Sequence, residues 1–152
     1  MPKDIVIQQE KVAKAQGLAF IAPVFWCHFP AIMKGWFERV LNYGFAFGLD
    51  SAGWQGNVSG RIPMLKHKRA LIITPTLFCE EDYERAGLKR AMTTIINDWG
   101  LRYPGIHKVD HVYFHAVNDA TSRGYLERAY QLGREYDSAQ AESVGASVTR
   151  VV

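Results

Sequence analysis

The chain has 152 residues, which is long enough for one domain with its own hydrophobic core. Its apolar fraction of 48% and charged fraction of 22% are ordinary for a globular protein, and its net charge of +3 is too small to indicate a nucleic-acid surface. No apolar run reaches the about 18 residues that a membrane-spanning helix needs, so we expect no membrane insertion. The two cysteines are too few for a disulfide framework or a zinc site, and they predict a cytoplasmic protein without a bound metal.

The hydropathy pattern predicts helices that alternate with strands along the chain. The first apolar run is continuous, which indicates a strand buried on both faces of a parallel sheet. Pro30 opens a helix, because its missing N–H costs nothing in the first turn. The predicted helices cover residues 4–15, 30–42, 80–99 and 122–136, and the predicted strands cover 18–22, 70–74 and 111–117.

This alternation predicts one α/β domain over residues 1–137, built on a parallel sheet. The segment 138–152 is small and polar, and we expect it to be disordered. The glycine-rich stretch 44–60 is longer than most connections, which favours a functional loop over an incidental one. Parallel α/β sheets bind ligands at the carboxyl ends of their strands. The three following loops, 23–29, 74–78 and 117–121, are therefore the predicted site.

One stretch carries a longer pattern. Residues 23–40 read P-V-F-W-C-H-F-P-A-I-M-K-G-W-F-E-R-V, and residues 44–47 read G-F-A-F. The fixed spacing of P-x-x-W, P-A-x-x-K-G-W-x-x-R-V and G-F-A-[YF] resembles the flavodoxin-like NAD(P)H:quinone reductase family, which includes NAD(P)H dehydrogenase (quinone) enzymes and drug-activity modulators. The resemblance covers essentially everything before the C-terminal segment. It implies a flavodoxin-like sheet with helices on both faces.

The resemblance also implies an activity. It predicts that hydride passes from NAD(P)H through FAD, with FMN as the alternative flavin, to a quinone or nitroaromatic acceptor, and that the protein is a homodimer. An alternative function is a non-catalytic dimeric binding or regulatory subunit that has lost the cofactor. A one-electron FMN carrier is disfavoured, because such carriers are typically acidic and this chain carries net positive charge.

The first loop is suited to hold a flavin ring. Its backbone N–H groups and the Trp26 ring can lie along a flat aromatic ligand and stabilise negative charge on it, although Trp26 could instead be a core aromatic. His28 stands where relatives often have glycine, and it could donate a hydrogen bond, titrate, or do neither. The resemblance places Arg123 near the adenine side of FAD. The predicted cofactor-binding residues are Pro23, Val24, Phe25, Trp26, Cys27, His28, Thr74, Thr76 and Arg123.

The substrate pocket is predicted to involve Phe45, Phe47 and Trp26. In the family, the matching loop aromatics cross a dimer interface and form a wall of the partner's pocket; the alternative is a loop folded onto its own domain. Tyr83 and Lys89 are the predicted catalytic residues, since relatives place a tyrosine and a histidine at this spacing to stabilise charge. Both could equally be helix-surface residues.

Two departures from the family pattern affect the cofactor site. Relatives often have Thr-Thr-Gly-Gly where this chain has Thr74-Pro-Thr-Leu77, which predicts a narrower pocket. A complete flavodoxin-like sheet has the strand order 2-1-3-4-5, and the three strands predicted here match 3, 4 and 5. We therefore expect about 45 residues, with the phosphate-binding loop, to lie outside this chain. The strand 18–22 would then have an unpaired edge that favours dimerisation, exchange or aggregation. A truncated gene model, a split gene or a natural short form would each produce this sequence.

Overall fold

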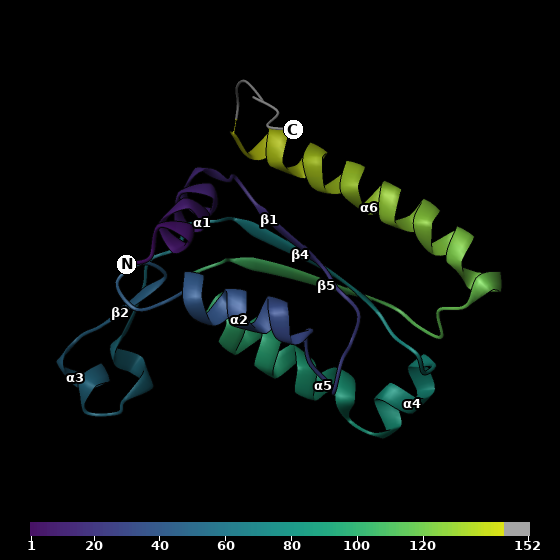
Figure 1. The fold of residues 1–152 in the computed structure, drawn as a ribbon, viewed down its shortest axis with the longest axis horizontal. Coiled ribbons are helices and arrows are strands. Elements are labelled where there is room, and N and C mark those ends of the chain that lie inside the picture. Colours follow the sequence, from purple (N-terminus) through teal and green to yellow (C-terminus); the bar gives the residue numbers. More distant parts are fainter. Residues whose placement is uncertain (145–152) are drawn as a thin grey trace.

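The computed structural model describes residues 1–144 and arranges them around a three-stranded parallel sheet (Figure 1). The elements in chain order are α1 (Lys3–Lys14), β1 (Leu18–Ile21), α2 (Ala31–Val40), β2 (Phe47–Leu49), α3 (Ser51–Trp54), the 3₁₀ turn η1 (Val58–Gly60), β3 (Arg61–Pro63), β4 (Arg69–Pro75), α4 (Glu80–Arg85), α5 (Leu88–Met92), the π-helical segment η2 (Thr93–Arg102), β5 (Lys108–Phe114) and α6 (Asp119–Val144). None of the helices described is long and apolar enough to cross a membrane.

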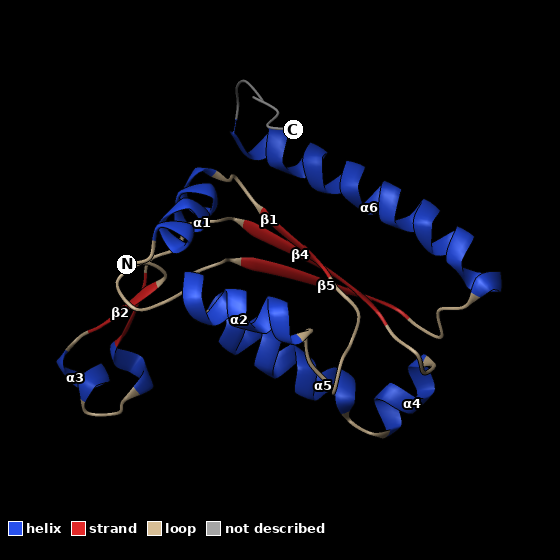
Figure 2. Cartoon of the chain, viewed as in Figure 1, coloured by secondary structure: helices blue, strands red, loops and turns tan. Residues whose placement is uncertain are grey.

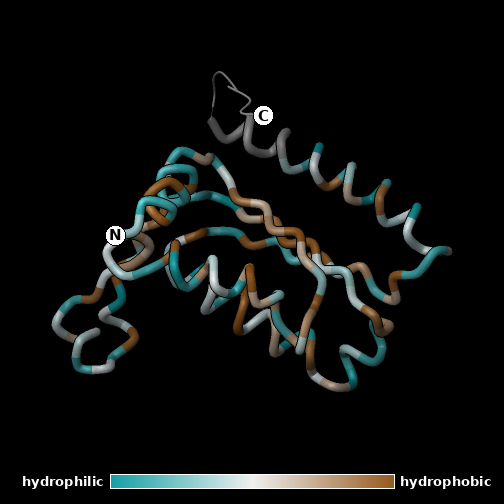
Figure 3. Tube along the Cα trace, in the orientation of Figure 1, coloured by the Kyte–Doolittle hydropathy of each residue, from teal (hydrophilic) through white to brown (hydrophobic). Residues whose placement is uncertain are grey.

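The sheet has the order β1-β4-β5, and both pairs of strands are parallel. The predicted flavodoxin-like arrangement is confirmed, with helices on both faces of the sheet (Figure 2). One face packs against α1, α2 and η2 in a large apolar cluster, and the other face packs against α6 in a smaller one. β4 lies in the middle, where residues 70–74 are all buried. The apolar segments accordingly gather in the central strands (Figure 3).

β1 differs from its prediction. Leu18 and Phe20 are buried, but Ile21, whose side chain points to the opposite face, is 66% exposed. Alternation along a strand sends successive side chains to opposite faces, and α6 packs on β4 and β5 and leaves the Ile21 side open. β1 is an edge strand, and within the described residues its outer edge pairs with no other strand.

The glycine-rich stretch forms the hairpin β2–β3 with α3 and η1 at its tip. Two of its glycines are required by close approach, since a Cβ on Gly60 would lie 2.0 Å from the backbone nitrogen of Gly53. Asp50 caps α3 by accepting a hydrogen bond from the Gly53 N–H at 3.0 Å. These glycines therefore serve the folding of the hairpin, and the function expected of this loop depends on its aromatic residues.

Three helix or strand boundaries in the structure differ from the predicted ones. The helix expected over 80–99 is divided at Gly87, whose φ of +69° is left-handed, and it continues as η2 to Arg102. β5 ends at Phe114, because Ala116 has a φ of +49° that a strand does not allow. α6 ends at Val144 and so includes the first part of the segment for which disorder was expected, while residues 145–152 lie outside the described residues.

Candidate functional site

The three loops predicted from topology meet at one edge of the sheet. The Val24 N–H donates to the Pro75 carbonyl at 3.1 Å, which fastens the loop after β1 to β4. The Val117 N–H donates to the Thr76 carbonyl at 3.1 Å and fastens the loop after β5 to the same strand. The carboxyl edge, as we call the loops 22–29, 75–79 and 115–118, is therefore one continuous surface.

Backbone strain is concentrated at the carboxyl edge. Among the described residues, the non-glycine positions with left-handed φ are Trp26 at 49°, Cys27 at 61° and Ala116 at 49°. Trp26 and Cys27 are the central pair of a tight turn, closed by hydrogen bonds of 2.8 and 3.0 Å between Phe25 and His28. Each such residue costs roughly 1–2 kcal/mol, and strain of this kind clusters at binding sites.

This turn and the loop after β4 expose apolar side chains to solvent, and we call this surface the platform. Trp26 is 100% exposed, so it is not the core aromatic that the sequence allowed. Phe25 on the same turn, and Leu77 and Phe78 on the loop after β4, are also largely exposed. The N–H groups of Trp26 and Cys27 donate to no backbone acceptor among the described residues. The platform therefore combines exposed rings with free hydrogen-bond donors, as a planar aromatic ligand with carbonyl groups requires.

The two threonines predicted to bind the cofactor have their hydroxyls engaged inside the protein. Thr74 is fully buried, and its Oγ1 lies 2.7 Å from His111 Nε2. The Thr76 hydroxyl donates to the Phe78 carbonyl at 2.9 Å and therefore accepts from His115 Nδ1 at 3.1 Å. Both side chains shape the carboxyl edge from beneath, and a role in direct ligand contact stays a prediction.

A buried polar network beneath the carboxyl edge was missed by sequence reasoning. His111 on β5 bonds Asn97 of η2, with Nδ1 at 2.9 Å from Asn97 Oδ1. An amide oxygen only accepts, so Nδ1 carries the proton and the Thr74 hydroxyl donates to Nε2. Burial lowers the pKa of His111 from 6.5 to about 4, which keeps the ring neutral. The network ties β4, β5 and η2 together.

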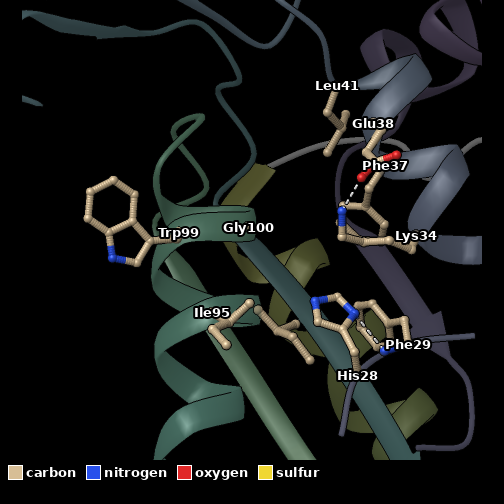
Figure 4. Close-up of a pocket in the computed structure, with 10 residues that line it drawn as sticks. His28, Phe29, Lys34, Phe37, Glu38, Leu41, Ile95, Trp99 and Gly100 are labelled. Atoms are coloured by element: carbon tan, nitrogen blue, oxygen red, sulfur yellow. Dashed lines mark hydrogen bonds and ion pairs between the residues drawn. The ribbon is translucent and has the colours of Figure 1, made fainter. Parts of the chain in front are cut away.

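His28 points into a cavity between α2 and η2, not toward the exposed platform (Figure 4). Its Nδ1 accepts a hydrogen bond of 2.7 Å from the Phe29 N–H. Burial, followed by the Lys34 cation, lowers the pKa of His28, and the Glu38 carboxylate opposes them. We call this space, with a volume of about 270 Å³, the α2–η2 cavity. Its lining residues are His28, Phe29, Lys34, Phe37, Glu38, Leu41, Ile95, Ile96, Trp99 and Gly100.

The predicted catalytic pair lies on the short helices that follow β4. Tyr83 is buried, its ring centroid is 5.3 Å from that of His115, and burial raises its pKa, with a further contribution from Cys27. Lys89 forms ion pairs with Glu80 at 2.7 Å and Glu84 at 2.8 Å, and these two carboxylates raise the pKa of its ammonium. The cation is thus balanced next to its own helix, and its catalytic role stays a prediction.

Of the remaining predicted residues, Phe45 and Phe47 are not brought to the carboxyl edge of their own chain. Phe45 and Phe47 flank the fully buried Ala46 and pack partly against the core. β2 lies beside the ends at which β4 and β5 begin, away from the loop that follows β1 (Figure 1). Arg123, with a side chain 91% exposed, makes an ion pair of 3.5 Å with Glu127 on α6. One chain therefore does not assemble the whole predicted pocket.

Among the residues that the structure describes, no cluster of His, Cys, Asp or Glu side chains could hold a metal ion. The features that define the site suit an organic ligand: they are exposed aromatic rings, backbone N–H groups without a backbone acceptor among the described residues, and an apolar cavity. The exposed rings and the backbone donors lie at the carboxyl ends of parallel strands, where doubly wound α/β folds bind nucleotide-type ligands.

Comparison with known proteins agrees with this reading of the fold. The family model described as flavodoxin-like fold matches residues 1–135, and the chain belongs to that family. It is 38% identical over 107 residues to the ribosyldihydronicotinamide dehydrogenase (quinone) of Homo sapiens, an alignment covering 70% of this chain and 42% of that protein. The predicted resemblance to NAD(P)H:quinone reductases is confirmed.

Two solved structures show the same fold. The NAD(P)H:quinone oxidoreductase from Methanothermobacter marburgensis superposes with a TM-score of 0.79 at 28% identity, over 88% of this chain and 65% of that one. General stress protein 14 from Treponema denticola, solved in complex with FMN, has a TM-score of 0.62 at 20% identity over 90% of this chain and 73% of that one. The chain spans less than half of the human protein and about two thirds of the archaeal one.

Proposed function

We propose that this chain forms the flavin-ring and acceptor-binding part of an NAD(P)H:quinone oxidoreductase of the cytoplasm. The observation that carries the proposal is the apolar platform at the carboxyl edge, where Trp26 is completely exposed on a strained turn. Strained backbone clusters at functional sites, and a group of exposed apolar side chains is typical of a binding surface. Both cysteines are free thiols, which supports a reducing compartment.

The residues present fit the ring system of a flavin. Phe25 and Trp26 on one loop and Leu77 and Phe78 on the next offer apolar surface, and the free N–H groups of Trp26 and Cys27 can bond the carbonyl oxygens of its pyrimidine edge. When bound, a flavin supplies two-electron transfer between NAD(P)H and a quinone. Both FAD and FMN carry this ring, so the platform accepts either; we favour FAD from the family pattern, with Arg123 toward its adenine side.

The protein's own contribution is positioning. The Phe25–His28 hydrogen bonds hold the turn, and the threonines below clamp the loops after β4 and β5 together. Tyr83, whose hydroxyl stays protonated because burial raises its pKa, is suited to donate a hydrogen bond toward developing negative charge. The side chains of the platform itself, Phe25, Trp26, Leu77 and Phe78, are uncharged, which favours a neutral aromatic acceptor such as a quinone or nitroaromatic.

We further propose that the working unit is a homodimer. Phe45 and Phe47 lie away from the carboxyl edge of their own chain, so they can reach such an edge only on another copy. Their rings would then form the second wall of the acceptor pocket opposite Trp26.

The proposal is tested by titrating the purified chain with FAD and with FMN. We expect the flavin to quench tryptophan fluorescence and to raise the melting temperature, and the loaded protein to oxidise NADPH when a quinone is added. Trp26→Ala should abolish flavin binding, whereas Trp54→Ala, which removes another exposed tryptophan from α3, should leave it unchanged. A colourless protein with no thermal shift would contradict the enzyme, and stable self-association in that case would favour the non-catalytic dimeric subunit.

A further inference from the structure

The α2–η2 cavity has the size and lining of a small-molecule site. Its volume of about 270 Å³ is just below the range of roughly 300–1,000 Å³ for drug-sized ligands, so it suits a molecule of one or two rings. Apolar side chains line it from both sides. They are Phe29, Phe37 and Leu41 near α2 and Ile95 and Ile96 on η2. A hydrocarbon ring is therefore buried favourably here, because water in this apolar part of the cavity finds few hydrogen-bond partners.

One hydrogen-bond donor is aimed into this apolar space. The Phe29 N–H donates to His28 Nδ1, so this nitrogen carries no proton, and in the neutral ring the proton sits on Nε2. Nε2 is directed into the space between α2 and η2 (Figure 4). Within the described part of the chain Nε2 bonds no acceptor, and it stays accessible to solvent through the mouth of the cavity. The cavity thus presents an N–H donor whose direction is set by the backbone.

The rim of the cavity carries no net charge. Lys34 and Glu38 stand one helical turn apart on α2 and form an ion pair with each other. Their charges cancel at the mouth, so the cavity offers no field that would select a cation or an anion. The chemistry that matches the site is a neutral aromatic compound with one hydrogen-bond acceptor.

We propose that the α2–η2 cavity binds a neutral one- or two-ring aromatic carbonyl compound, whose oxygen accepts the hydrogen bond of His28 Nε2–H. The His28 backbone closes the strained turn that carries Trp26, so occupancy of the cavity stabilises the platform from behind. Binding as such is independent of a flavin. The occupant is a second aromatic carbonyl molecule, distinct from the acceptor that the proposed function places at the platform opposite Trp26.

The test compares two probes of one shape in the flavin-free chain. 1-Indanone has a carbonyl group and indane lacks it, and both are two-ring hydrocarbons otherwise. We expect 1-indanone to bind about five- to tenfold more tightly, which is the worth of one neutral hydrogen bond. In NMR spectra the His28 Nε2–H signal should move with 1-indanone and stay in place with indane.

Variants test the His28 hydrogen-bond donor and the volume of the cavity separately. His28→Phe should bind both probes equally, while His107→Phe, which changes an exposed histidine, should keep the preference for 1-indanone. Leu41→Trp fills the cavity and should abolish binding of both probes. The matched control Ile32→Trp enlarges a side chain of α2 that is 86% exposed and does not line the cavity, and it should have no effect.

Several results would overturn the proposal. Equal binding of the two probes by the unmodified chain would remove the role of His28, and a preference that persists in His28→Phe would do the same. Failure of both probes to bind, or loss of binding as the protein self-associates, would show that the cavity is closed or filled by a second copy. Absence of flavin binding with intact 1-indanone binding would contradict the proposed function alone.

Discussion

The partly buried His111 makes the free energy of unfolding depend on pH in a way that can be measured. Its pKa is about 4 in the folded chain against 6.5 for a free histidine, and burial is the cause. Between these values the unfolded chain binds a proton at this position and the folded chain does not. The free energy of unfolding is therefore constant above about pH 6.5 and falls as the pH decreases toward 4.

The size of the effect follows from the difference between the two pKa values. A gap of about 2.5 units corresponds to about 3 kcal/mol once the pH is below both values, at 1.36 kcal/mol for each unit. By about pH 5 the loss amounts to about 2 kcal/mol. For a domain of this size, such a loss shifts a urea midpoint by roughly 1 M.

The assay is urea unfolding, followed by tryptophan fluorescence in steps from about pH 7.5 to about pH 5. His111→Gln removes the titrating ring. Between about pH 7.5 and about pH 5 this variant should therefore lose about 2 kcal/mol less of its free energy of unfolding than the unmodified chain loses. At neutral pH the variant should be less stable by about 1–3 kcal/mol, because Thr74 and Asn97 lose a well-placed partner.

His107→Gln is the matched control, since His107 precedes the same strand and is exposed. It should follow the pH profile of the unmodified chain. Other titrating groups are common to all three proteins and cancel in the comparison. If the free energy of unfolding of His111→Gln fell with decreasing pH as steeply as that of the unmodified chain, His111 would not be desolvated and neutral. The network described above would then be wrong.

Three further outcomes test other parts of the structure. Cys27→Gly should raise the thermal midpoint, by about 0.5–1 kcal/mol in stability, because glycine accepts the φ of 61° at this turn; a lower midpoint would mean that the turn is not strained. Tyr136→Phe should cost about 1–2 kcal/mol of stability in urea unfolding, since its hydroxyl lies 3.0 Å from the Leu18 carbonyl and 2.9 Å from that of Arg69. Tyr130→Phe, at an exposed position of α6, should be silent, and equal losses would contradict the assignment. Lys89→Met should slow NADPH-dependent quinone reduction by less than about tenfold, because Glu80 and Glu84 already balance the cation; a much larger loss in steady-state assays would support its direct role.

Much of the fold could be predicted from local pattern. β4 was expected as a continuous apolar strand over residues 70–74, and its central position buries all five of them. The sheet order followed from matching three strands to a known topology, and the site followed from the rule that parallel sheets bind ligands at their carboxyl ends. These features depend on short-range periodicity and on chain connectivity, which a sequence displays directly.

The departures have long-range causes. Ile21 reads as a core residue in an apolar run, but its exposure depends on whether another element covers that face. His28 and Trp26 are close neighbours in one loop, and a turn with left-handed backbone sends one side chain into a cavity and leaves the other in solvent. Thr74 was expected to face a ligand, yet a histidine 37 residues away holds its hydroxyl. Contacts between residues far apart in the chain produce no periodic pattern in the sequence, so they could not be predicted from it.

The sequence by itself determined the class of this protein. Alternating apolar runs and a motif of fixed spacing define a flavodoxin-like domain and an aromatic loop at the carboxyl ends of its strands, because these properties arise from order along the chain. Only the tertiary structure decided which side chains of that motif are exposed and which point into a cavity. It exposes Trp26 as a platform, turns His28 into the α2–η2 cavity, and places β2, with Phe47 at its start, away from the carboxyl edge of its own chain. The physical reason is that direction and burial are set by backbone geometry and by neighbours distant in sequence.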